Sequence, residues 1–250
     1  MTPFNTITKL IIFPIYYLIH YNFFFGYIQK KLIKFFFYKN FKFSLKNCDF
    51  PLPYYSSFLF NTYELNDRKI IQKNLSKKNK CIIIGGGIGF IGVLAFHYTK
   101  NPIIIFEINK KIISNLKNNL KINNTKFKLF AGNLSLNKKS QKNFFFQHKN
   151  FLATSIYRKG NFKTKLKNYN YKNIKNLKKF NTLIIDGEGI EEHYINNIQK
   201  LPFIKYLIFE FHNDIFSENN KNVLFNKLKK NKFFIKDRFI NSYFFEKKLN

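Results

Sequence analysis

Glycine residues gathered at one turn are the first feature of this sequence that could do chemistry. Gly85 to Gly87 and Gly89 follow the apolar run Ile82 to Ile84. Because glycine lacks a Cβ, it takes positive φ values readily and lets a ligand touch the backbone. Glu107 ends the next apolar run, Ile103 to Phe106, and an acid at the end of a parallel strand can accept hydrogen bonds from ribose hydroxyls. The two features together predict a cofactor with a nucleoside group at this turn.

The glycine spacing fits two classes of cofactor. Gly87, Gly89 and Gly92 satisfy G-x-G-x-x-G, the dinucleotide fingerprint. Gly85, Gly87 and Gly89 instead satisfy x-G-x-G-x-G, which resembles the first motif of Rossmann-like S-adenosylmethionine-dependent methyltransferases. The second pattern begins directly after the strand, so we favour it. It normally carries an acid two residues before its first glycine, where this sequence has Ile83.

A second group of polar residues follows later apolar runs. Asp186 comes directly after Leu183 to Ile185, and Glu210 and His212 stand at the end of the run 204–211. A positioned Asp, Glu or His can take the proton of an acceptor hydroxyl. We expect Asp186 to position the reacting groups and Glu210 or His212 to be the base. The plainer alternative for His212 is that it only ends a strand.

Asn133 follows a third strand, predicted at Lys126 to Phe130. Its amide could contact an adenine, and a polar turn is the alternative interpretation. The residues predicted to bind the cofactor are Gly85, Gly87, Gly89, Glu107 and Asn133.

An α/β scaffold is needed to bring these residues together. Short apolar runs alternate with segments of helical spacing such as Lys110 to Ile122, which is typical of a parallel sheet covered by helices. With a closing strand pair near Phe233 to Phe245, we predict a mostly parallel sheet of about seven strands with helices on both faces. Ligands of such sheets bind at the carboxyl ends of the strands. We place this domain at 81–250, after a linker at 47–80.

The first 46 residues form a hydrophobic and basic segment. The run Leu10 to Ile28 is apolar or aromatic except for His20 and Asn22, and lysines alternating with phenylalanines follow it up to Lys46. Aromatic residues beside lysines suit the surface of an anionic membrane. We expect residues 10–46 to be a helical anchor that spans or lies on the membrane, with the cofactor on the cytoplasmic side; the alternative is a helical hairpin packed on the domain.

The high positive charge does not by itself indicate a nucleic-acid protein. The formal net charge is +31, but nearly all of it is Lys, and Lys, Asn, Ile and Phe are abundant in every segment, as expected of an AT-rich coding bias. Arg, the residue suited to bidentate phosphate and base contacts, occurs only at Arg68, Arg158 and Arg238. We therefore expect no dedicated nucleic-acid site.

Cysteine and histidine usage predicts neither disulfides nor a metal site. Cys48 and Cys81 are the only cysteines, and the five histidines are scattered without the spacing of metal ligands. This pattern is typical of a reducing compartment, so we expect a cytoplasmic protein.

The separate motifs together resemble one family. IIIGGGIGF, IIIFEIN, IIDGEGIE and LIFEFH occur in this order, and the chain from about Cys81 to Phe245 is similar to the FkbM family of S-adenosylmethionine-dependent methyltransferases. The resemblance implies a class I Rossmann-like fold, S-adenosylmethionine as cofactor and O-methylation of a hydroxyl on a sugar, glycan or small metabolite. Residues before Cys81 are not covered.

Two departures from the family pattern leave other functions open. Ile83 replaces the usual acid, and Gly187 stands where the family's I-D-V-E-G motif has an apolar residue. One alternative is a membrane-associated binding or scaffold protein that keeps the fold with weakened turnover. Another is an NAD(P)-dependent oxidoreductase, although no catalytic Tyr/Lys pair is recognisable.

Overall fold

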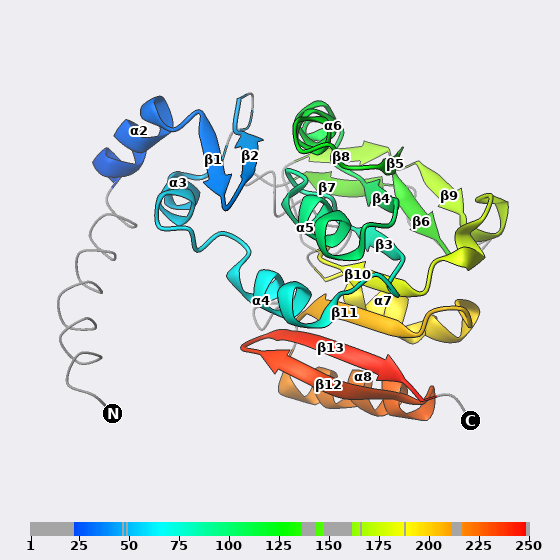
Figure 1. Ribbon diagram of the computed structural model, residues 1–250. Coiled ribbons are helices and arrows are strands. Elements are labelled where there is room, and N and C mark those ends of the chain that lie inside the picture. The colour runs from blue at the N-terminus through cyan, green and yellow to red at the C-terminus, as the bar shows by residue number, and fades with distance from the viewer. Residues whose placement is uncertain are drawn as a thin grey trace, which may run out of the picture. The chain divides into compact units, whose positions relative to one another are not determined.

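The computed structural model describes residues 23–46, 48, 50–136, 144–147, 162–165, 167–187, 189–211 and 217–248. The chain divides into two compact units, Met1–Tyr63 and Glu64–Asn250 (Figure 1).

The described residues of the smaller unit form two helices and a β-hairpin. In chain order these are α2 (Phe23–Leu32), β1 (Phe35–Tyr38), β2 (Phe41–Ser44) and α3 (Leu52–Leu59). Strands β1 and β2 pair antiparallel around the turn at Lys39 and Asn40. The fold of 35–44 differs from the helical segment expected there, because buried and exposed residues alternate along β1, which is the period of a strand. Among the described residues, no helix has both the length and the hydropathy needed to cross a bilayer.

The larger unit is built on a seven-stranded sheet with the order β12-β13-β11-β10-β3-β4-β5. The pairs from β11 through β10, β3 and β4 to β5 are parallel, and β13 runs antiparallel to both β11 and β12. The predicted mostly parallel sheet is confirmed. The strands are β3 (Cys81–Ile84), β4 (Ile103–Glu107), β5 (Phe127–Ala131), β10 (Thr182–Ile185), β11 (Tyr206–Glu210), β12 (Phe233–Phe239) and β13 (Ser242–Lys247).

Helices cover both faces of this sheet (Figure 1). On one face α4 packs against β11, β12 and β13, and α5 packs against β4, α4 and α6. On the other face α7 and α8 pack against each other, and α8 also contacts β12. The helices are α4 (Leu65–Asn74), α5 (Phe90–Thr99), α6 (Ile113–Ile122), α7 (Glu191–Asn196) and α8 (Glu218–Lys230).

The described residues between β5 and β10 form two further strand pairs. β6 (Asn133–Ser135) pairs parallel with β9 (Asn168–Asn170), and β7 (Phe144–Gln147) pairs antiparallel with β8 (Phe162–Lys165). Short 3₁₀ turns occur at Tyr171–Asn173, Leu177–Lys179 and Ile198–Lys200.

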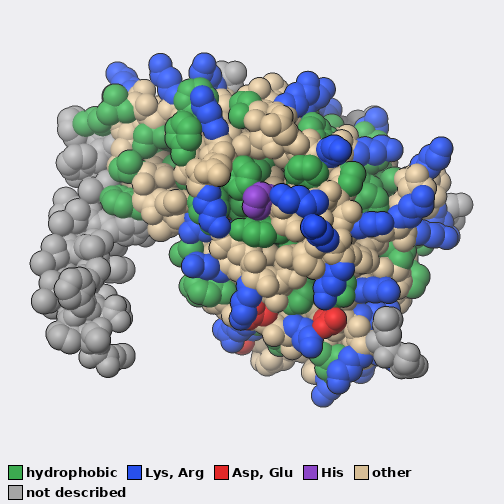
Figure 2. All heavy atoms as spheres, viewed as in Figure 1, with side chains coloured by type: hydrophobic (Ala, Val, Ile, Leu, Met, Phe, Trp, Pro, Cys, Tyr) green, Lys and Arg blue, Asp and Glu red, His purple; other side chains and the backbone are tan. Residues whose placement is uncertain are grey.

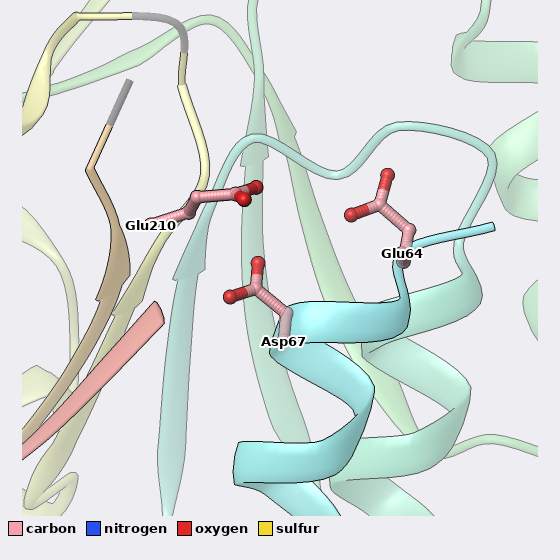
Figure 3. A group of neighbouring side chains, drawn as sticks. All are labelled: Glu64, Asp67 and Glu210. Atoms are coloured by element: carbon pink, nitrogen blue, oxygen red, sulfur yellow. The ribbon is translucent and has the colours of Figure 1, made fainter. Parts of the chain in front are cut away.

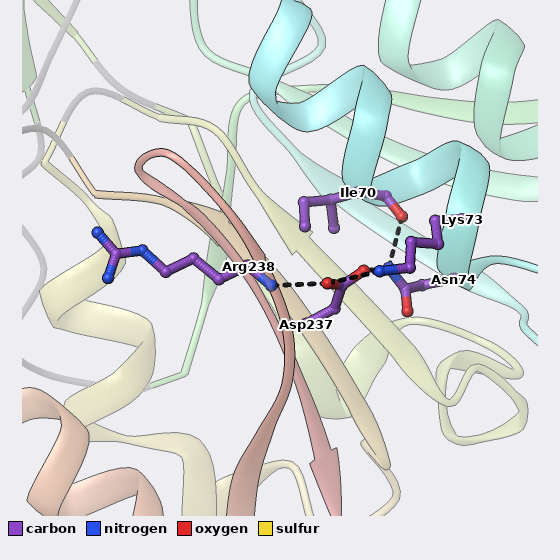
Figure 4. A network of polar contacts seen from close by, with 5 residues as sticks. All are labelled: Ile70, Lys73, Asn74, Asp237 and Arg238. Carbon is purple, nitrogen blue, oxygen red and sulfur yellow. Dashed lines mark hydrogen bonds and ion pairs between the residues drawn. The ribbon is translucent and has the colours of Figure 1, made fainter. Parts of the chain in front are cut away.

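The segment expected to be a linker, 47–80, contains α3 and α4 instead. Helix α4 belongs to the larger unit and is tied to the edge strand β12 through Asp237, which accepts hydrogen bonds from Asn74 Nδ2 (2.8 Å) and the Arg238 backbone N–H (3.0 Å). Lys73 Nζ pairs with the same carboxylate at 3.0 Å. Figure 4 shows these contacts converging on Asp237, so the sheet has a helical cover that the apolar pattern did not reveal.

Candidate active site

The strand register places the polar residues predicted from the sequence in one row. Ile84 of β3 is paired with Phe106 of β4 and with Ile185 of β10, and Ile185 is paired with Phe209 of β11. The residues that follow these four are Gly85, Glu107, Asp186 and Glu210. Because all four strands are parallel, the row lies at the carboxyl edge of the sheet, with the glycine turn between Glu107 on one side and Asp186 on the other.

The side chains of this row belong to the face covered by α4, α5 and α6. Ile84, Phe106, Ile185 and Phe209 all belong to the core cluster that also contains Tyr194 of α7 and Leu228 of α8. Successive residues of a strand point to opposite faces, so the residues one position later belong to the opposite face. The contact between Asn66 of α4 and Glu210 agrees with this assignment.

Gly85 is needed for the approach of β3 to β10. A Cβ on Gly85 would lie 1.7 Å from the Asp186 carbonyl oxygen, and its φ is +88°. The Asp186 N–H donates to the Ile84 carbonyl at 2.9 Å, and the Gly85 N–H donates to the Phe106 carbonyl at 3.0 Å. The first glycine of the pattern therefore has a structural role at the centre of the candidate site.

The Glu107 carboxylate is bound by the glycine turn. Its Oε2 accepts hydrogen bonds from the backbone N–H groups of Gly86 (2.8 Å) and Gly87 (3.0 Å), and its Oε1 accepts one from Asn109 (2.7 Å). The residue is 6 % exposed. Burial raises the pKa of Glu107, and the backbone hydrogen bonds act in the opposite direction. Glu107 thus fixes the shape of the turn in addition to standing where a ribose is expected.

Asp186 leads into a turn that is held by a second buried acid. Asp186 is partly exposed, and the next N–H group, that of Gly187, donates to Glu191 Oε1 at 3.2 Å. Glu191 is the first residue of α7 and is fully buried. A Cβ on Gly187 would lie 2.4 Å from Ile190 Cγ2. Glycine at this position, the departure noted in the sequence, is therefore explained by the tight turn into α7.

Glu210 lies in a group of three carboxylates. Oxygens of Glu64, Asp67 and Glu210 all lie within 4.8 Å of one another, and Figure 3 shows the three side chains pointing toward one another from the start of α4 and the end of β11. Asn66 Nδ2 donates to Glu210 Oε1 at 2.8 Å, and Ser242 Oγ donates to Asp67 Oδ1 at 2.5 Å. Carboxylate oxygens are the ligands that hard cations prefer, so this group is where the described residues could hold one.

Asn133 is buried rather than open to a ligand. It is 2 % exposed, its Oδ1 accepts a hydrogen bond from the Tyr194 hydroxyl at 3.0 Å, and its Nδ2 donates to Asn168 Oδ1 at 3.4 Å. The same hydroxyl also lies 2.8 Å from the Leu134 carbonyl oxygen. Asn133 joins β6 to α7 and β9, and its contact with an adenine stays a prediction.

His212 lies outside the described residues, so its proposed role as a base stays a prediction. Ile83, at the position where the methyltransferase motif has an acid, is completely buried. The two cysteines are buried as well, and burial raises the pKa of the Cys48 thiol to about 12.

Several residues of the site were missed in the sequence. Glu64, Asn66 and Asp67 lie in the segment expected to be a linker, and Glu191 and Tyr194 lie in α7, after the predicted site residue Asp186. Two acids three residues apart, Glu64 and Asp67, were a local signal of this group in the sequence. Their partners were not, because Glu210 is 144 residues from Asn66 and Ser242 is 175 residues from Asp67.

A pocket of about 290 Å³ lies between α4 and the edge strand β12. Its lining residue Phe239 is paired with Ser242, which is paired with Glu210, so the pocket borders the outer end of the same row. It is lined by Lys69, Ile70, Gln72, Lys73, Asp237, Arg238 and Phe239. Figure 2 shows Lys and Arg side chains spread over the visible face of the molecule rather than gathered at one place.

No family model matches the chain, and no curated protein matches its sequence. Solved structures that resemble it include a methyltransferase from Pyrococcus furiosus (14% identity, 73% of this chain and 82% of that chain, TM-score 0.45). They also include the precorrin-6y C5,15-methyltransferase of Geobacter metallireducens (10% identity, 71% and 84%, TM-score 0.42). A third is TYW2 of P. horikoshii in complex with MeSAdo (9% identity, 84% and 68%, TM-score 0.48). Likenesses this weak carry no functional inference, so the function is argued from the chain's own strand order and site.

Proposed function

We propose that the protein is an S-adenosylmethionine-dependent methyltransferase that acts on a hydroxyl group. The observation that carries the proposal is the row at the carboxyl edge of the sheet, in which a glycine turn stands between Glu107 and Asp186. A cofactor bound across the turn would have Glu107 near its ribose on one side. Asp186 and Glu210 would lie near its methyl group on the other side.

The strand order favours this cofactor over a dinucleotide. The dinucleotide fold has the order 3-2-1-4-5-6 in a mostly parallel sheet. If the seven strands of this sheet are numbered in chain order, β5-β4-β3-β10-β11 corresponds to 3-2-1-4-5. The antiparallel β13, the last strand of the chain, then lies between β11 and β12. The glycine pattern that starts at Gly85 also begins directly after β3, as in the methyltransferase motif that it resembles.

The proposed reaction is an in-line displacement. The bond from the methyl carbon to the sulfonium sulfur breaks, its electron pair stays on sulfur, and a bond forms between the methyl carbon and the acceptor oxygen. The acceptor hydroxyl loses its proton to a general base near the transition state. Glu210 or His212 would take this proton, and Asp186 would align the acceptor with the methyl group, since alignment carries much of the catalysis of such a step.

The chemical class of the methyl acceptor is a separate step of the proposal. It rests on the resemblance of IIIGGGIGF, IIIFEIN, IIDGEGIE and LIFEFH to the FkbM family, whose members methylate hydroxyls of sugars and secondary metabolites. A small-molecule or glycan acceptor is therefore proposed. The cytoplasm, where S-adenosylmethionine is available, is the proposed location of the larger unit.

Calorimetric titration of the full chain with S-adenosylmethionine, S-adenosylhomocysteine and NADH tests the cofactor. We expect saturable binding of the first two and none of the third. NADH binding alone would make the protein an oxidoreductase, and binding of none of the three would leave a scaffold protein on the same fold.

Asp186→Asn tests the catalytic assignment. We expect this variant to bind S-adenosylmethionine like the parent and to transfer labelled methyl groups to hydroxylated acceptors roughly 100-fold more slowly or worse. Glu246→Gln, which removes an acid paired with Tyr206 at the opposite end of β11 from Glu210, is the matched control and keeps parental transfer. Parental transfer by Asp186→Asn would refute the role given to Asp186.

A further inference from the structure

The β1–β2 hairpin has two faces with different surroundings. Phe36 of β1 stacks on Phe43 of β2 at 5.7 Å between ring centroids and also contacts Phe58 of α3 at 5.3 Å. Phe36 and Phe43 are buried, so this face fixes the hairpin within the smaller unit. Phe35 and Phe37 belong to the opposite face, and Phe37 is 61 % exposed.

Lysines lie against the aromatic rings of this outer face. Lys42, which is paired with Phe37 across the hairpin, has its Nζ 4.2 Å from the centroid of the Phe35 ring and 5.9 Å from that of Phe37. Lys46 Nζ lies 5.7 Å from the Phe35 ring. An ammonium group over a ring leaves the hydrophobic body of the ring available on its other side.

Helix α2 adds exposed apolar side chains just before the hairpin. Leu32, its last residue, is 75 % exposed, and Tyr27 is 48 % exposed with Lys31 Nζ 4.7 Å from its ring. Gln29 of this helix is buried and accepts a hydrogen bond from Ser56 of α3. Figure 2 shows hydrophobic and basic side chains interspersed at the surface of the region that holds α2 and the hairpin.

The charged side chains of this unit are almost all positive. Asp49 is the first acidic residue of the sequence, and the described segment before it contains Lys30, Lys31, Lys34, Lys39, Lys42 and Lys46. Each basic residue near an anionic leaflet contributes attraction of about 1 kcal/mol. A surface that combines this charge with exposed apolar side chains is complementary to an anionic bilayer, where the lysines meet headgroups and the apolar groups enter the acyl boundary.

A single-stranded nucleic acid fits this surface less well. Nucleic-acid surfaces use aromatic rings for stacking together with basic groups, but the exposed Leu32 and Ile28 are aliphatic and offer no stacking face. The unit also contains no Arg, since Arg68 is the first in the sequence. The Leu32 side chain, which is three-quarters exposed to water, would be stabilised by transfer into the apolar part of a bilayer.

We propose that the outer face of the hairpin, Phe35, Phe37, Lys42 and Lys46, together with Leu32, docks the protein on the surface of an anionic lipid bilayer. This proposal does not depend on the function of the larger unit. It differs from the sequence expectation of a helical anchor, because the docking element is a folded hairpin that lies on the membrane.

Co-sedimentation of the full chain with lipid vesicles tests the proposal. We expect binding to vesicles of phosphatidylcholine with phosphatidylserine, weaker binding to phosphatidylcholine alone, and release by salt. Lys42→Gln with Lys46→Gln should weaken binding roughly 10- to 30-fold, and Leu32→Ser with Phe37→Ser should weaken it at least about tenfold. Circular dichroism establishes that each variant is folded.

Matched controls come from the larger unit. Lys229→Gln with Lys230→Gln removes the same charge from α8, and Val223→Ser with Ile240→Ser removes two apolar side chains that are 64 % and 57 % exposed. Equal losses in these controls would mean that binding is unspecific and would overturn the proposal. So would retention of binding by the hairpin variants, which would transfer the role to residues 1–22, or binding of single-stranded RNA in preference to the vesicles.

Discussion

The Glu107 carboxylate has little acceptor capacity left once the glycine turn is folded. A carboxylate offers about four lone-pair sites, and the N–H groups of Gly86, Gly87 and Asn109 occupy three of them. The Ile108 backbone N–H is a further donor to this carboxylate, so a ribose hydroxyl would have to share an acceptor site with one of these four donors or displace it. Glu107 therefore acts on the cofactor in two ways, directly and through the shape of the turn.

Glu107→Gln should affect folding and binding together. The glutamine amide can present one oxygen to Gly86 and Gly87, but its NH₂ group then faces the Asn109 N–H. Loss of that charge-assisted bond should destabilise the protein by roughly 1–3 kcal/mol and weaken S-adenosylmethionine binding about tenfold or more. Thermal unfolding and calorimetry measure the two effects. Glu218→Gln, an acid of α8 whose side chain is 71% exposed, is the control; a Glu107→Gln variant with unchanged stability would show that the turn holds its shape without the acid.

At the scale of elements, the contact between β3 and β10 sets the geometry of the site. Leu183 to Ile185 are paired with Ile82 to Ile84, and this pairing could be expected from two buried runs that each end in a functional residue. The close approach at Gly85 could not, because it depends on where the Asp186 carbonyl oxygen lies. The glycine pattern predicted a cofactor turn, whereas the structure adds a requirement of sheet packing at the same residue.

Gly85→Ala should destabilise the larger unit by at least about 2 kcal/mol, because the new methyl group would meet the Asp186 carbonyl oxygen and the residue would have to keep a positive φ. Gly92→Ala is the matched control. Its Cβ would meet side-chain carbons of Ile105 and Leu120 at 3.1 Å and of Ile103 at 3.3 Å, and the helix gains a better helix former. Chemical denaturation measures both, and equal stability of the two variants would refute the packing role of Gly85.

Asp237 gives the attachment of α4 to β12 a pH dependence. Burial acts to raise the pKa of Asp237, but the hydrogen bonds from Asn74, Lys73 and Arg238 outweigh it and lower this pKa. A carboxyl group with a lowered pKa in the folded state stabilises the protein above its unfolded value, near 3.9, and this contribution is lost as the pH falls through the folded value. The Lys73 side chain is 73% exposed, so its ion pair adds little.

Asp237→Asn should therefore cost roughly 0.5–1.5 kcal/mol of stability at pH 7, and this cost should shrink as the pH falls through the lowered pKa of Asp237 in the folded parent. Urea denaturation of parent and variant across this pH range gives the difference. Glu246→Gln, which removes a more exposed acid from the neighbouring strand β13, controls for net charge. A difference that is independent of pH would show that Asp237 acts through packing rather than ionisation.

For the whole molecule, the sequence predicted the strands of the sheet better than it predicted α4 and the hairpin. Isoleucine-rich runs indicated β3, β4 and β10 because parallel strands are buried on both faces. Helix α4 was missed because its apolar residues are few, and the buried Asp67 and Arg68 interrupt its hydrophobic pattern. The hairpin was missed because Phe occupies both the buried and the exposed positions of β1, so the sequence does not show the alternation of a strand. Contacts such as Asp67 to Ser242 join distant residues, and local patterns cannot show them.

The boundary of the larger unit is the last prediction. The sequence placed the start of the domain at Cys81, whereas the compact unit begins at Glu64. The fragment 64–250 keeps α4, and with it the bonds from Asn66 to Glu210, from Ser242 to Asp67 and from Asn74 to Asp237. The fragment 81–250 loses all three and uncovers the face of β11, β12 and β13 on which α4 packs.

We expect 64–250 to unfold cooperatively and to bind S-adenosylmethionine with the affinity of the full chain, since its core cluster and glycine turn lie within it. The fragment 81–250 should aggregate or melt at a markedly lower temperature, because α4 no longer covers the apolar face. Scanning calorimetry and cofactor titration compare the two fragments. If 81–250 were as stable as 64–250, α4 would be an appendage rather than part of the domain; if 64–250 failed to fold, the two units would depend on each other.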